Sequence, residues 1–473
     1  MALPSGSRIH LIGICGTAMA SLAAMLKESG YQVTGSDANV YPPMSTMLEG
    51  LGIAVKTPYS GRNLQPRPDL VIVGNAMSRG NPEVEEMLDD GIAFESMAET
   101  IKRSFLADRR SLVVAGTHGK TTTSFMLAWI LEVAGESDPS FRPGFLIGGM
   151  PENFPAGFRT QPEPGGFFVI EGDEYDTAFF DKGPKFLHYQ PRNLLLTSVE
   201  YDHVDIYPDF ESVKLAFRRL VNLVPASGVI VAAESATVAD CLSKAYCPVE
   251  RYGISATCHW RADHIETYEE WTRFEVFRGK DRFMRADLKA AGEHNVLNAV
   301  GALAMASHLG VPDRLIRQAL GTFQGVKRRM EVRGEVNGVI VVDDFAHHPT
   351  AVRATISGIR KRFPGKHVWA ILEPRSNTLR RRIFETELIE ALAEADRVTL
   401  AAVYHGEALP EAERLETGRV VMRLLREGLK ASTFATVQEI VTHTVANAKK
   451  GDILLVMSNG GFEGIHQKLL DRL

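Results

Sequence analysis

Residues 112–123 read LVVAGTHGKTTT and constrain the fold more than any other segment of the chain. The apolar run Leu112 to Val114 enters a glycine-bearing turn, and residues 124–133 (SFMLAWILEV) form an apolar stretch of helical length. A strand, a glycine-rich turn and a helix in this order point backbone N–H groups at an anion, which the helix dipole also favours. We therefore predict a phosphate-binding loop that comprises Gly116, Thr117, His118, Gly119, Lys120, Thr121 and Thr122.

Two side chains of this loop carry the expected chemistry. Lys120 is placed to reach the terminal phosphates of a nucleotide, and the Thr121 hydroxyl is placed to hold Mg²⁺. Val114 stands where the usual pattern has its first glycine, so the match is to a shortened loop, G-T-x-G-K-T. The alternative is a tight strand-to-helix turn with an incidental lysine. The strand before the loop and the helix after it favour the nucleotide site.

The composition is that of a soluble globular protein without a nucleic-acid partner. The 473 residues suggest two to four domains, and the apolar content of 45% with 23% charged residues is ordinary. A net charge of −5 gives no basic surface for nucleic acid. The four cysteines form no C-x-x-C pair, which favours reduced thiols over disulfides or zinc. They are Cys15, Cys241, Cys247 and Cys258.

The N-terminus imitates a secretory signal peptide. Arg8 precedes the run IHLIGICGTAMA, which ends in an A-x-A-like site at Ala18 to Ala20. We favour a first strand that continues through a glycine turn into a helix, because His10 and two glycines interrupt the apolar core. No other run reaches membrane-spanning length without charges. We therefore expect a cytoplasmic protein with no membrane partner.

Residues 1–107 alternate short apolar runs with helical patterns, which predicts a parallel sheet of βαβ units. Gly13 and Gly16 follow the first predicted strand, and Ser36 and Asp37 follow the second. A Rossmann-like domain binds its nucleotide at these positions. Because Cys15 stands where a dinucleotide fingerprint has its second glycine, a dehydrogenase is disfavoured. The strands are expected in RIHLIGI, YQVTGSD, IAVKT, DLVIVGN and IAFES.

The rest of the chain is predicted to form two further α/β domains, residues 108–326 and 327–473. A less regular β-rich stretch is expected over 250–290, and a long helix within 292–310. In the middle domain, polar residues follow the ends of two apolar strands, where open α/β sheets place ligands. They are Glu171, Asp173, Glu174 and Asp176 after the first strand, and Tyr201, Asp202, His203 and Asp205 after the second.

These acidic segments suggest metal binding beside the phosphate loop. Mg²⁺ prefers carboxylate and phosphate oxygens, and a second divalent ion would tolerate His203. Taken alone, the acidic residues could form a solvated loop, and His203 could be a hydrogen-bonded core residue. Their placement in one domain with the phosphate loop favours the site.

The third domain also has polar residues at apolar strand ends. Asp343 and Asp344 end a VIVV strand and could bind a ribose hydroxyl, whereas Arg328 and Arg329 could equally form a solvated hinge. The further candidates are His347, His348, Arg375, Ser458 and Asn459.

Together these motifs resemble the Mur ligases of peptidoglycan synthesis over essentially the whole chain. The resemblance rests on GTHGKTTT, on the E-x-D-E-x-D and DH-x-D-x-Y segments, and on DDFAHHP. It implies a UDP-sugar-binding Rossmann-like domain (1–107), a central ATP-binding domain (108–326), and a C-terminal Rossmann-like domain that carries the incoming amine (327–473).

Within the family, the segments LEPRSNT and MSNGGFEGIHQKLL resemble the branch that joins UDP-N-acetylmuramate to the tripeptide L-alanyl-γ-D-glutamyl-meso-diaminopimelate in peptidoglycan recycling. The reaction would consume ATP with Mg²⁺ and pass through an acyl phosphate. Diaminopimelate and lysine stay open at the third peptide position. The alternatives are the ligase that adds L-alanine to the same sugar nucleotide, and a nucleotide-binding scaffold without catalysis. A monomer or weak homodimer is expected.

The resemblance also implies roles for individual residues. Lys120, Glu171 and His203 would be catalytic, and Thr121, Glu171 and His203 would hold metal. Asn295 and Asn298 would reach the adenine, and Arg329 and Asp344 would contact ATP or form the hinge. The UDP group would lie against Gly13, Gly16, Thr17, Ser36, Asp37 and Asn75. The peptide would contact His348, Arg375, Ser458 and Asn459.

Overall fold

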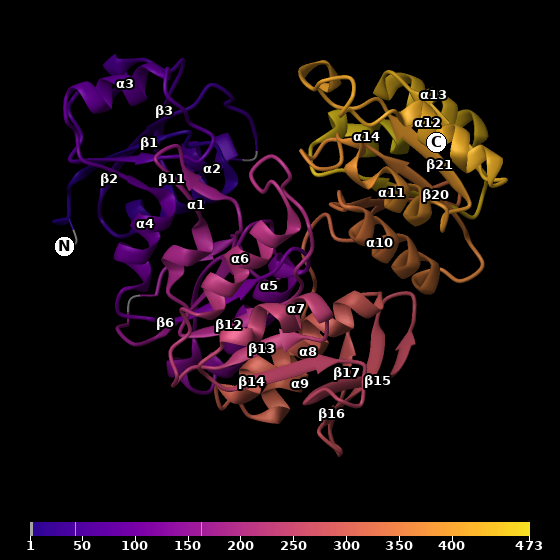
Figure 1. The fold of residues 1–473 in the computed structure, drawn as a ribbon, viewed down its shortest axis with the longest axis horizontal. Coiled ribbons are helices and arrows are strands. Elements are labelled where there is room, and N and C mark those ends of the chain that lie inside the picture. Colours follow the sequence, from indigo (N-terminus) through magenta and orange to yellow (C-terminus); the bar gives the residue numbers. More distant parts are fainter. Residues whose placement is uncertain (1–2, 43, 162) are drawn as a thin grey trace.

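The computed structural model of the chain describes residues 3–42, 44–161 and 163–473. Three successive α/β parts, each built around one large sheet, confirm the predicted fold class. We call them the N-terminal, middle and C-terminal parts. The N-terminal part, in indigo, and the C-terminal part, in yellow, both sit on the same side of the middle part (Figure 1).

The N-terminal part is a five-stranded parallel sheet in the order β3-β2-β1-β4-β5. Each predicted strand is present, and α1 runs uninterrupted through Ala18 to Ala20, so the strand–turn–helix interpretation of the N-terminus is confirmed. The elements are β1 (Arg8–Ile12), α1 (Thr17–Glu28), β2 (Gln32–Ser36), α2 (Met44–Gly50), β3 (Ala54–Lys56), β4 (Leu70–Val73), α3 (Pro82–Asp89), β5 (Phe94–Ser96) and α4 (Met97–Ile101).

The middle part is a ten-stranded sheet in the order β17-β16-β15-β14-β13-β12-β6-β9-β7-β8. The parallel pairs run through β7, β9, β6, β12, β13, β14 and β15. Several neighbours in this sheet are not consecutive in the chain, so crossover connections join them. They are β6 (Arg110–Ala115), β7 (Gly144–Leu146), β8 (Phe158–Arg159), β9 (Phe167–Gly172), β12 (Asn193–Leu196), β13 (Ile230–Ala233), β14 (Val249–Gly253), β15 (Trp260–Thr267), β16 (Thr272–Arg278) and β17 (Asp281–Leu288). The helices are α5 (Lys120–Gly135), α6 (Phe210–Val221), α7 (Ala236–Cys241), α8 (Glu293–His308) and α9 (Asp313–Thr322).

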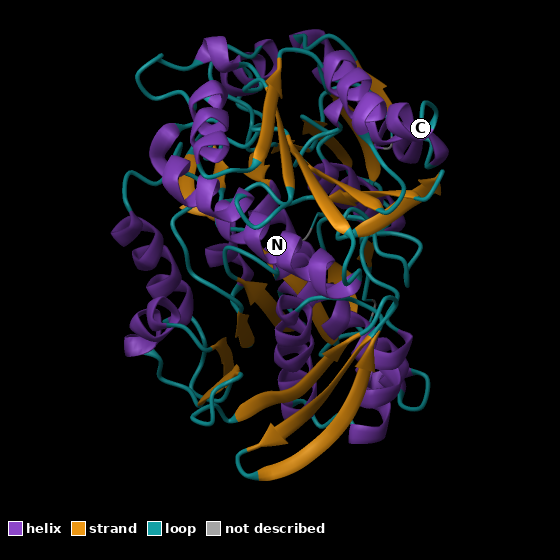
Figure 2. Cartoon of the chain, turned by 90° about the vertical axis from the view of Figure 1, so that its right-hand side faces the viewer, coloured by secondary structure: helices purple, strands orange, loops and turns teal. Residues whose placement is uncertain are grey.

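The less regular β-rich stretch expected over 250–290 is confirmed. Strands β15, β16 and β17 form an antiparallel extension of the sheet whose pairing contains register shifts, visible as the long strands at the lower end of Figure 2. Their side chains alternate between buried and exposed positions, and Trp260, Phe274 and Leu288 pack into the same core as α5 and α8. The predicted long helix is α8.

The C-terminal part is a six-stranded sheet in the order β18-β19-β23-β20-β21-β22, in which only β18 is antiparallel to its neighbour. Helices cover both faces, because residues of α10 to α12 and residues of α13 and α14 belong to two separate cores. The elements are β18 (Glu331–Val336), β19 (Val339–Asp344), α10 (Pro349–Arg362), β20 (His367–Leu372), α11 (Glu385–Leu392), β21 (Arg397–Ala401), α12 (Thr417–Arg426), β22 (Lys430–Phe434), α13 (Val437–Asn447), β23 (Asp452–Met457) and α14 (Ile465–Leu470).

The N-terminal and middle parts share one hydrophobic core. Met97 and Phe105, near the end of the N-terminal part, pack in the same cluster as Phe186 and Phe217 of the middle part. The hairpin of β10 (Asp176–Ala178) and β11 (Asp181–Pro184) adds an edge-to-face contact between the rings of Phe180 and Phe94. No helix in the described part of the chain is long and apolar enough to cross a membrane.

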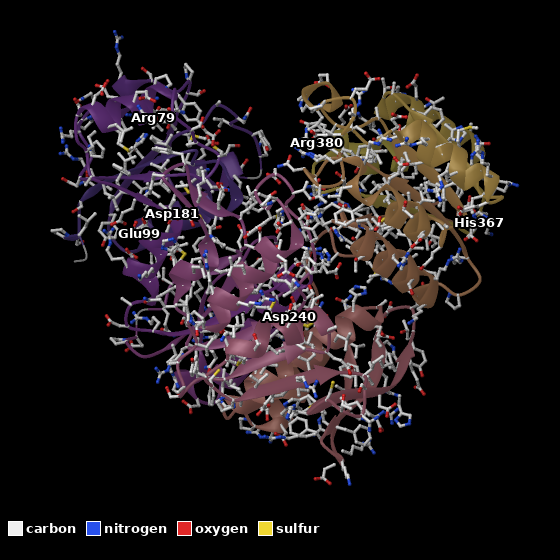
Figure 3. All side chains as sticks on the ribbon, viewed as in Figure 1. Arg79, Glu99, Asp181, Asp240, His367 and Arg380 are labelled. Atoms are coloured by element: carbon white, nitrogen blue, oxygen red, sulfur yellow. The ribbon has the colours of Figure 1, made fainter. Side chains whose placement is uncertain are left out.

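The C-terminal part presents different residues to its two sides. Arg380 lies on the side that faces the N-terminal part, whereas His367 lies on the far side (Figure 3). The chain segment around Arg380 follows β20 and therefore belongs to the carboxyl-end edge of the sheet.

Candidate active site

A cavity of about 780 Å³ lies between the middle and C-terminal parts. The carboxyl ends of β6, β9 and β12 face those of β19, β20 and β23 across it, which is where open α/β sheets bind ligands. Three predicted site residues, Gly116, His348 and Ser458, are not in the cavity lining but are adjacent in sequence to residues that are. The predicted residues that line the cavity are Thr117, His118, Gly119, Lys120, Thr121, Thr122, Glu171, His203, Asn295, Asn298, Arg329, Asp344, Arg375 and Asn459.

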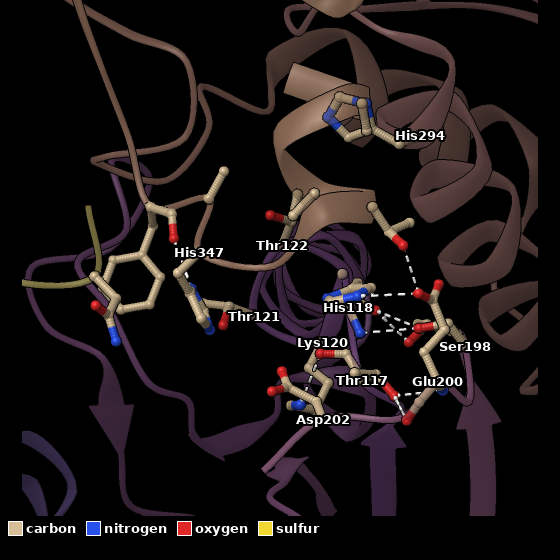
Figure 4. Close-up of a pocket in the computed structure, with 18 of the residues that line it drawn as sticks. Thr117, His118, Lys120, Thr121, Thr122, Ser198, Glu200, Asp202, His294 and His347 are labelled. Carbon is tan, nitrogen blue, oxygen red and sulfur yellow. Dashed lines mark hydrogen bonds and ion pairs between the residues drawn. The ribbon is translucent and has the colours of Figure 1, made fainter. Parts of the chain in front are cut away.

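The predicted phosphate loop joins β6 to α5 and forms one wall of the cavity (Figure 4). Both of its glycines have a positive φ, 140° for Gly116 and 81° for Gly119. A Cβ atom on Gly116 would lie 2.1 Å from Thr197 Oγ1, and one on Gly119 would lie 2.6 Å from Asn298 Oδ1. Other residues would therefore clash or be strained. Helix α5 begins at Lys120, so its first amide groups have no partner within the helix and can bind an anion.

Lys120 is held by a carboxylate that the sequence did not single out. Its Nζ donates to both carboxylate oxygens of Glu174, at 2.9 and 2.7 Å, and to Gly116 O at 2.6 Å. Burial alone would lower the pKa of Lys120, but the nearby carboxylates, Glu174 foremost, hold this pKa above its usual value. The ammonium charge is therefore fixed at the end of the phosphate loop.

Glu174 also orients His203. The Nε2 atom of His203 lies 3.0 Å from Glu174 Oε1, and the hydroxyl of Tyr207 donates to the Glu174 carbonyl at 2.7 Å. Although burial alone would lower the pKa of His203, the hydrogen bond and charge of Glu174 raise it above its usual value. The structure thus joins the predicted catalytic residues Lys120 and His203 through Glu174.

Thr121 and Glu171 meet as the sequence predicted for a metal site. Thr121 Oγ1 donates to Glu171 Oε1 at 2.8 Å, and the amide of Gly148 donates to Glu171 Oε2 at 2.8 Å. Burial raises the pKa of Glu171 above its usual range, against the opposing effects of Lys120 and Thr121. Because burial makes ionisation of this carboxylate unfavourable, a bound cation would stabilise its charged form.

The predicted adenine-contacting residues lie side by side on α8. Asn295 Nδ2 donates to Ala291 O at 2.7 Å, and Asn298 Nδ2 lies 3.5 Å from Asn295 Oδ1. The Asn298 amide also stands directly over Gly119, so it contacts the phosphate loop as well as the cavity.

The predicted hinge is a strained backbone segment. Arg328 and Met330 both have a positive φ, 61° and 50°, which is uncommon for residues with side chains. The amide of Met330 donates to Asp344 Oδ2, while Ala346 N and Thr355 Oγ1 donate to Asp344 Oδ1. Because both Asp344 oxygens accept bonds from the protein, the contacts favour its hinge role over ribose binding. Arg329 lies in this segment and faces the cavity.

The C-terminal wall carries the predicted peptide-binding residues. The Arg375 guanidinium stacks 3.7 Å above the Tyr404 ring, with NH1 3.6 Å from Glu373 Oε1. Ser458 donates to Glu373 Oε2 at 2.5 Å, so its hydroxyl supports the wall from behind. Asn459 Oδ1 is buried and has no hydrogen-bond partner among the described residues. An unpaired acceptor beside an arginine is suited to a ligand that carries both amino and carboxylate groups.

Direct hydrogen bonds cross the cavity between the two parts. Asn377 Nδ2 donates to Asp205 Oδ2 at 2.7 Å, and Thr350 Oγ1 donates to Glu200 Oε2 at 2.6 Å. The predicted peptide residue His348 is buried and lies with Nε2 3.3 Å from Tyr201 O. The C-terminal part is therefore closed onto the middle part in this structure.

The predicted UDP-binding residues collect at the carboxyl edge of the N-terminal sheet. Gly13 has a φ of 81°, and Asp37 accepts from the amide of Cys15 at 2.9 Å. Gly16 lies at the N-terminus of α1, and the exposed Thr17 begins that helix.

Two other members of this set differ in exposure. Asn75 is exposed after β4, whereas Ser36 is fully buried and donates its hydroxyl to Glu83. Glu83 also contacts His10 Nε2 at 3.3 Å and Asn63 Nδ2 at 2.6 Å. Ser36 therefore supports the edge through a buried polar network. Among the described residues, none before Thr117 lines the main cavity, so the structure keeps the two predicted nucleotide sites apart.

The sequence left several site residues unassigned. Glu174 stood in an acidic segment with other candidates, and only its contacts separate it from Asp173, whose carboxylate pairs with Lys185 at 2.6 Å. Thr378 lies within the LEPRSNT segment, yet its contact with Asp202 depends on how two parts pack. The sequence signal for Glu174 was the acidic segment that follows an apolar strand, and the signal for Thr378 was the segment SNT.

The fold and cavity define a three-part α/β ligase built around a nucleotide-phosphate loop. Family models match along the chain as "Mur ligase family, catalytic domain" over residues 8–109, "Mur ligase middle domain" over 114–306, and "Mur ligase, glutamate ligase domain" over 328–460. The chain belongs to the Mur ligase family.

Individual relatives narrow the comparison. The chain is 44% identical to the UDP-N-acetylmuramate–L-alanyl-γ-D-glutamyl-meso-2,6-diaminoheptandioate ligase of Escherichia coli, with 98% of each chain covered. It is 32% identical to the UDP-N-acetylmuramate–L-alanine ligase of Desulforamulus reducens, again over 98% of each chain. The crystal structure of a murein peptide ligase from Psychrobacter arcticus matches with a TM-score of 0.73 and 39% identity, covering 99% of this chain and 98% of that one.

Proposed function

We propose that this chain joins UDP-N-acetylmuramate to L-alanyl-γ-D-glutamyl-meso-diaminopimelate, with ATP as the energy source, in the cytoplasm. The observation that carries the proposal is the shared cavity, which connects the phosphate loop at Lys120 to Arg375 and Asn459 on the opposite wall. The higher identity to the E. coli tripeptide ligase than to the L-alanine ligase supports the larger acceptor.

ATP is needed because a carboxylate is a poor electrophile and amide formation in water is unfavourable. The lactyl carboxylate oxygen would attack the γ-phosphorus of ATP, and ADP would leave. The peptide amine, in its neutral form, would then attack the acyl carbon, expel phosphate and lose a proton. The acyl phosphate is the product of the first step and the reactant of the second. Both steps need close positioning of charged groups.

Lys120 and the amide groups at the start of α5 would stabilise charge on the transferred phosphoryl group. Glu174 holds the Lys120 ammonium at the phosphate loop and also fixes His203, so one buried carboxylate positions two groups of the reaction centre.

The donor set fits Mg²⁺. Among the described residues, the three carboxylates of Glu171, Asp173 and Glu174 lie beside two ammonium groups, Lys120 and Lys185, and a cation would balance the excess negative charge. The Thr121 hydroxyl, Glu171 and His203 would hold the ion. When bound, Mg²⁺ would neutralise phosphate oxygens during transfer.

The three parts would divide the substrates between them, with boundaries at 107/108 and 326/327. The UDP group would bind at the Gly13, Asp37 and Asn75 edge of the N-terminal part. The buried network of Ser36 and Glu83 would keep that edge in shape. Because this edge lies outside the main cavity and the N-terminal and middle parts share one hydrophobic core, the sugar nucleotide would extend from this edge to the cavity. A monomer or weak homodimer would suffice, since the described chain provides all of the proposed groups.

An isotope experiment tests the chemistry. UDP-N-acetylmuramate labelled with ¹⁸O in the lactyl carboxylate is incubated with enzyme, ATP, Mg²⁺ and tripeptide, and product and phosphate are analysed by mass spectrometry. The proposal predicts the amide product and transfer of one labelled oxygen to the released phosphate. Amide formation with unlabelled phosphate would contradict the acyl phosphate, and absence of any product would favour a non-catalytic scaffold.

A further inference from the structure

His118, Glu200 and His348 bring three potential metal ligands together outside the proposed Mg²⁺ site. One nitrogen from each histidine and one Glu200 carboxylate oxygen all lie within 4.8 Å of one another. His118 Nε2 is 3.6 Å from Glu200 Oε2, and His348 Nδ1 is 3.9 Å from the same oxygen. Both distances are longer than those of hydrogen bonds but within the range of ion pairs, so the three side chains converge without short bonds among them.

The contacts around the cluster show which atoms of the two histidines and of Glu200 are available to a cation. His348 Nε2 lies 3.3 Å from the Tyr201 carbonyl and can only donate there, so neutral His348 carries its lone pair on Nδ1. In this structure Nδ1 accepts from the Thr350 amide at 3.4 Å, a long bond that a metal ion at Nδ1 would replace. His118 Nε2 is buried and has no hydrogen-bond partner among the described residues. Glu200 Oε2 accepts from the Thr350 hydroxyl at 2.6 Å, which holds the carboxylate beside both histidines. Two imidazole nitrogens and a carboxylate oxygen within 4.8 Å of one another form a donor set of the kind that binds transition-metal ions.

The three ligands come from different elements on both sides of the cavity. His118 belongs to the phosphate loop, Glu200 follows β12, and His348 is the N-cap residue of α10 in the C-terminal part. We propose that His118, Glu200 and His348 bind a divalent transition-metal ion such as Zn²⁺, which ties the C-terminal part to the phosphate loop. Imidazole nitrogens select Zn²⁺ over Mg²⁺, and three protein ligands leave a fourth position for water or a phosphate oxygen.

This site differs from the proposed Mg²⁺ site in both chemistry and residues. Thr121 and Glu171 offer oxygen atoms only, and the neighbouring His203 is hydrogen-bonded to Glu174. An ion at the histidine cluster would hold the closed arrangement, because it would connect two parts that otherwise meet through hydrogen bonds such as Thr350 to Glu200.

The test is equilibrium dialysis of the nucleotide-free full chain against Zn²⁺, with metal measured by elemental analysis. The variants are His348→Gln and Glu200→Gln in the cluster, His203→Gln at the Mg²⁺ site, and His405→Gln as an exposed-histidine control. We expect one tightly bound Zn²⁺ that His203→Gln and His405→Gln retain. Loss of either cluster ligand should weaken binding by at least the ~10- to 100-fold that loss of a supporting partner costs at metal sites.

Hydrogen exchange provides a second readout that does not depend on activity. Zn²⁺ should slow amide exchange at the start of α10 in the wild-type chain and leave it unchanged in Glu200→Gln, whose side chain keeps the size of the original. Failure of the wild-type chain to bind Zn²⁺ tightly would overturn the proposal. Retained binding in His348→Gln together with its loss in His203→Gln would also overturn it, by placing the ion at the catalytic centre.

Discussion

Thr378 and Asp202, which are 176 residues apart, are joined by a 2.5 Å hydrogen bond from the Thr378 hydroxyl to Asp202 Oδ1. The same carboxylate oxygen accepts the amide of His203 at 2.7 Å. Burial alone would raise the pKa of Asp202, but nearby histidines, His203 foremost, and the Thr378 bond hold it below its usual range. One buried carboxylate thus connects the C-terminal part to the backbone of a proposed catalytic residue.

Replacing Thr378 with valine should loosen closure, because the side chain keeps its shape but loses the donor. A hydrogen bond to a charged group contributes about 1.5–3 kcal/mol, so we expect turnover to fall by about 10-fold or more. Amide exchange in residues 376–380 should speed up in parallel. Thr378→Ser, which keeps the hydroxyl, should remain near wild type, and wild-type exchange in Thr378→Val would contradict the account.

Replacing Glu174 with glutamine should disconnect Lys120 from His203. We expect turnover to fall by about 10²-fold, which is comparable to the loss of one electrostatic stabiliser. The pKa of His203 should also fall, since Glu174 contributes more than Asp202 to raising it, and NMR titration of the histidine signals measures this directly. Asp176→Asn is the matched control, because Asp176 lies in the same acidic segment but pairs with the exposed Lys182. An unchanged His203 pKa in Glu174→Gln would contradict the proposal that Glu174 connects Lys120 to His203.

Replacing Lys120 with alanine should lower turnover by at least ~10²–10³, because the variant lacks charge stabilisation of the transferred phosphoryl group. The measurement is the rate of phosphate release at saturating substrates. Near-wild-type turnover would remove Lys120 from the reaction centre.

Acid should destabilise the protein partly through His294. Burial, with the charges of Arg329 and Lys361, lowers the pKa of His294 to about 4. Between an unfolded pKa of about 6.5 and that folded value, the unfolded chain binds the proton and the native chain does not, so stability falls as pH falls. His294→Gln should show a smaller drop in apparent Tm from pH 7.5 to pH 5 than wild type. The exposed-histidine variant His405→Gln should match wild type, and equal drops in all three proteins would contradict the assignment.

Replacing Arg375 with alanine should raise the KM for tripeptide far more than the KM for ATP, because the guanidinium lies on the wall opposite the phosphate loop. Arg375→Lys keeps the charge but loses the bidentate fork, so its KM for tripeptide should lie between those of the wild type and Arg375→Ala. Steady-state kinetics with each substrate varied separately gives both constants. Equal effects on the two KM values would remove Arg375 from the peptide site.

Local patterns predicted the fold class and the strand–turn–helix at 112–133 well, because both depend on residues close in sequence. The strand, turn and helix at 112–133 are contiguous, so their relative placement follows from chain geometry. The strand-end rule likewise brought Glu171 and Thr121 together correctly. The β-rich stretch over 250–290 was predicted as well, whereas the antiparallel pairing of its strands was not.

Contacts between the parts could not be predicted in this way. The bond from Thr378 to Asp202 and the grouping of Glu200 with His348 depend on how two separately folded sheets dock.

The burial of Ser36 within the N-terminal part could not be predicted either. Its side chain contacts a buried acid, Glu83, on a helix whose other acidic residues are more exposed. Burial of a carboxylate is unfavourable unless several donors surround it, so sequence pattern alone gave no reason to expect it.

The identity of the amine acceptor is the central claim, and phosphate release tests it most directly. Enzyme, ATP, Mg²⁺ and UDP-N-acetylmuramate are combined with either the tripeptide or L-alanine, and kcat/KM is compared for the two acceptors. The account predicts rapid release that requires the tripeptide and little release with L-alanine. A higher kcat/KM for L-alanine would contradict the proposed substrate and make the chain an alanine-adding ligase.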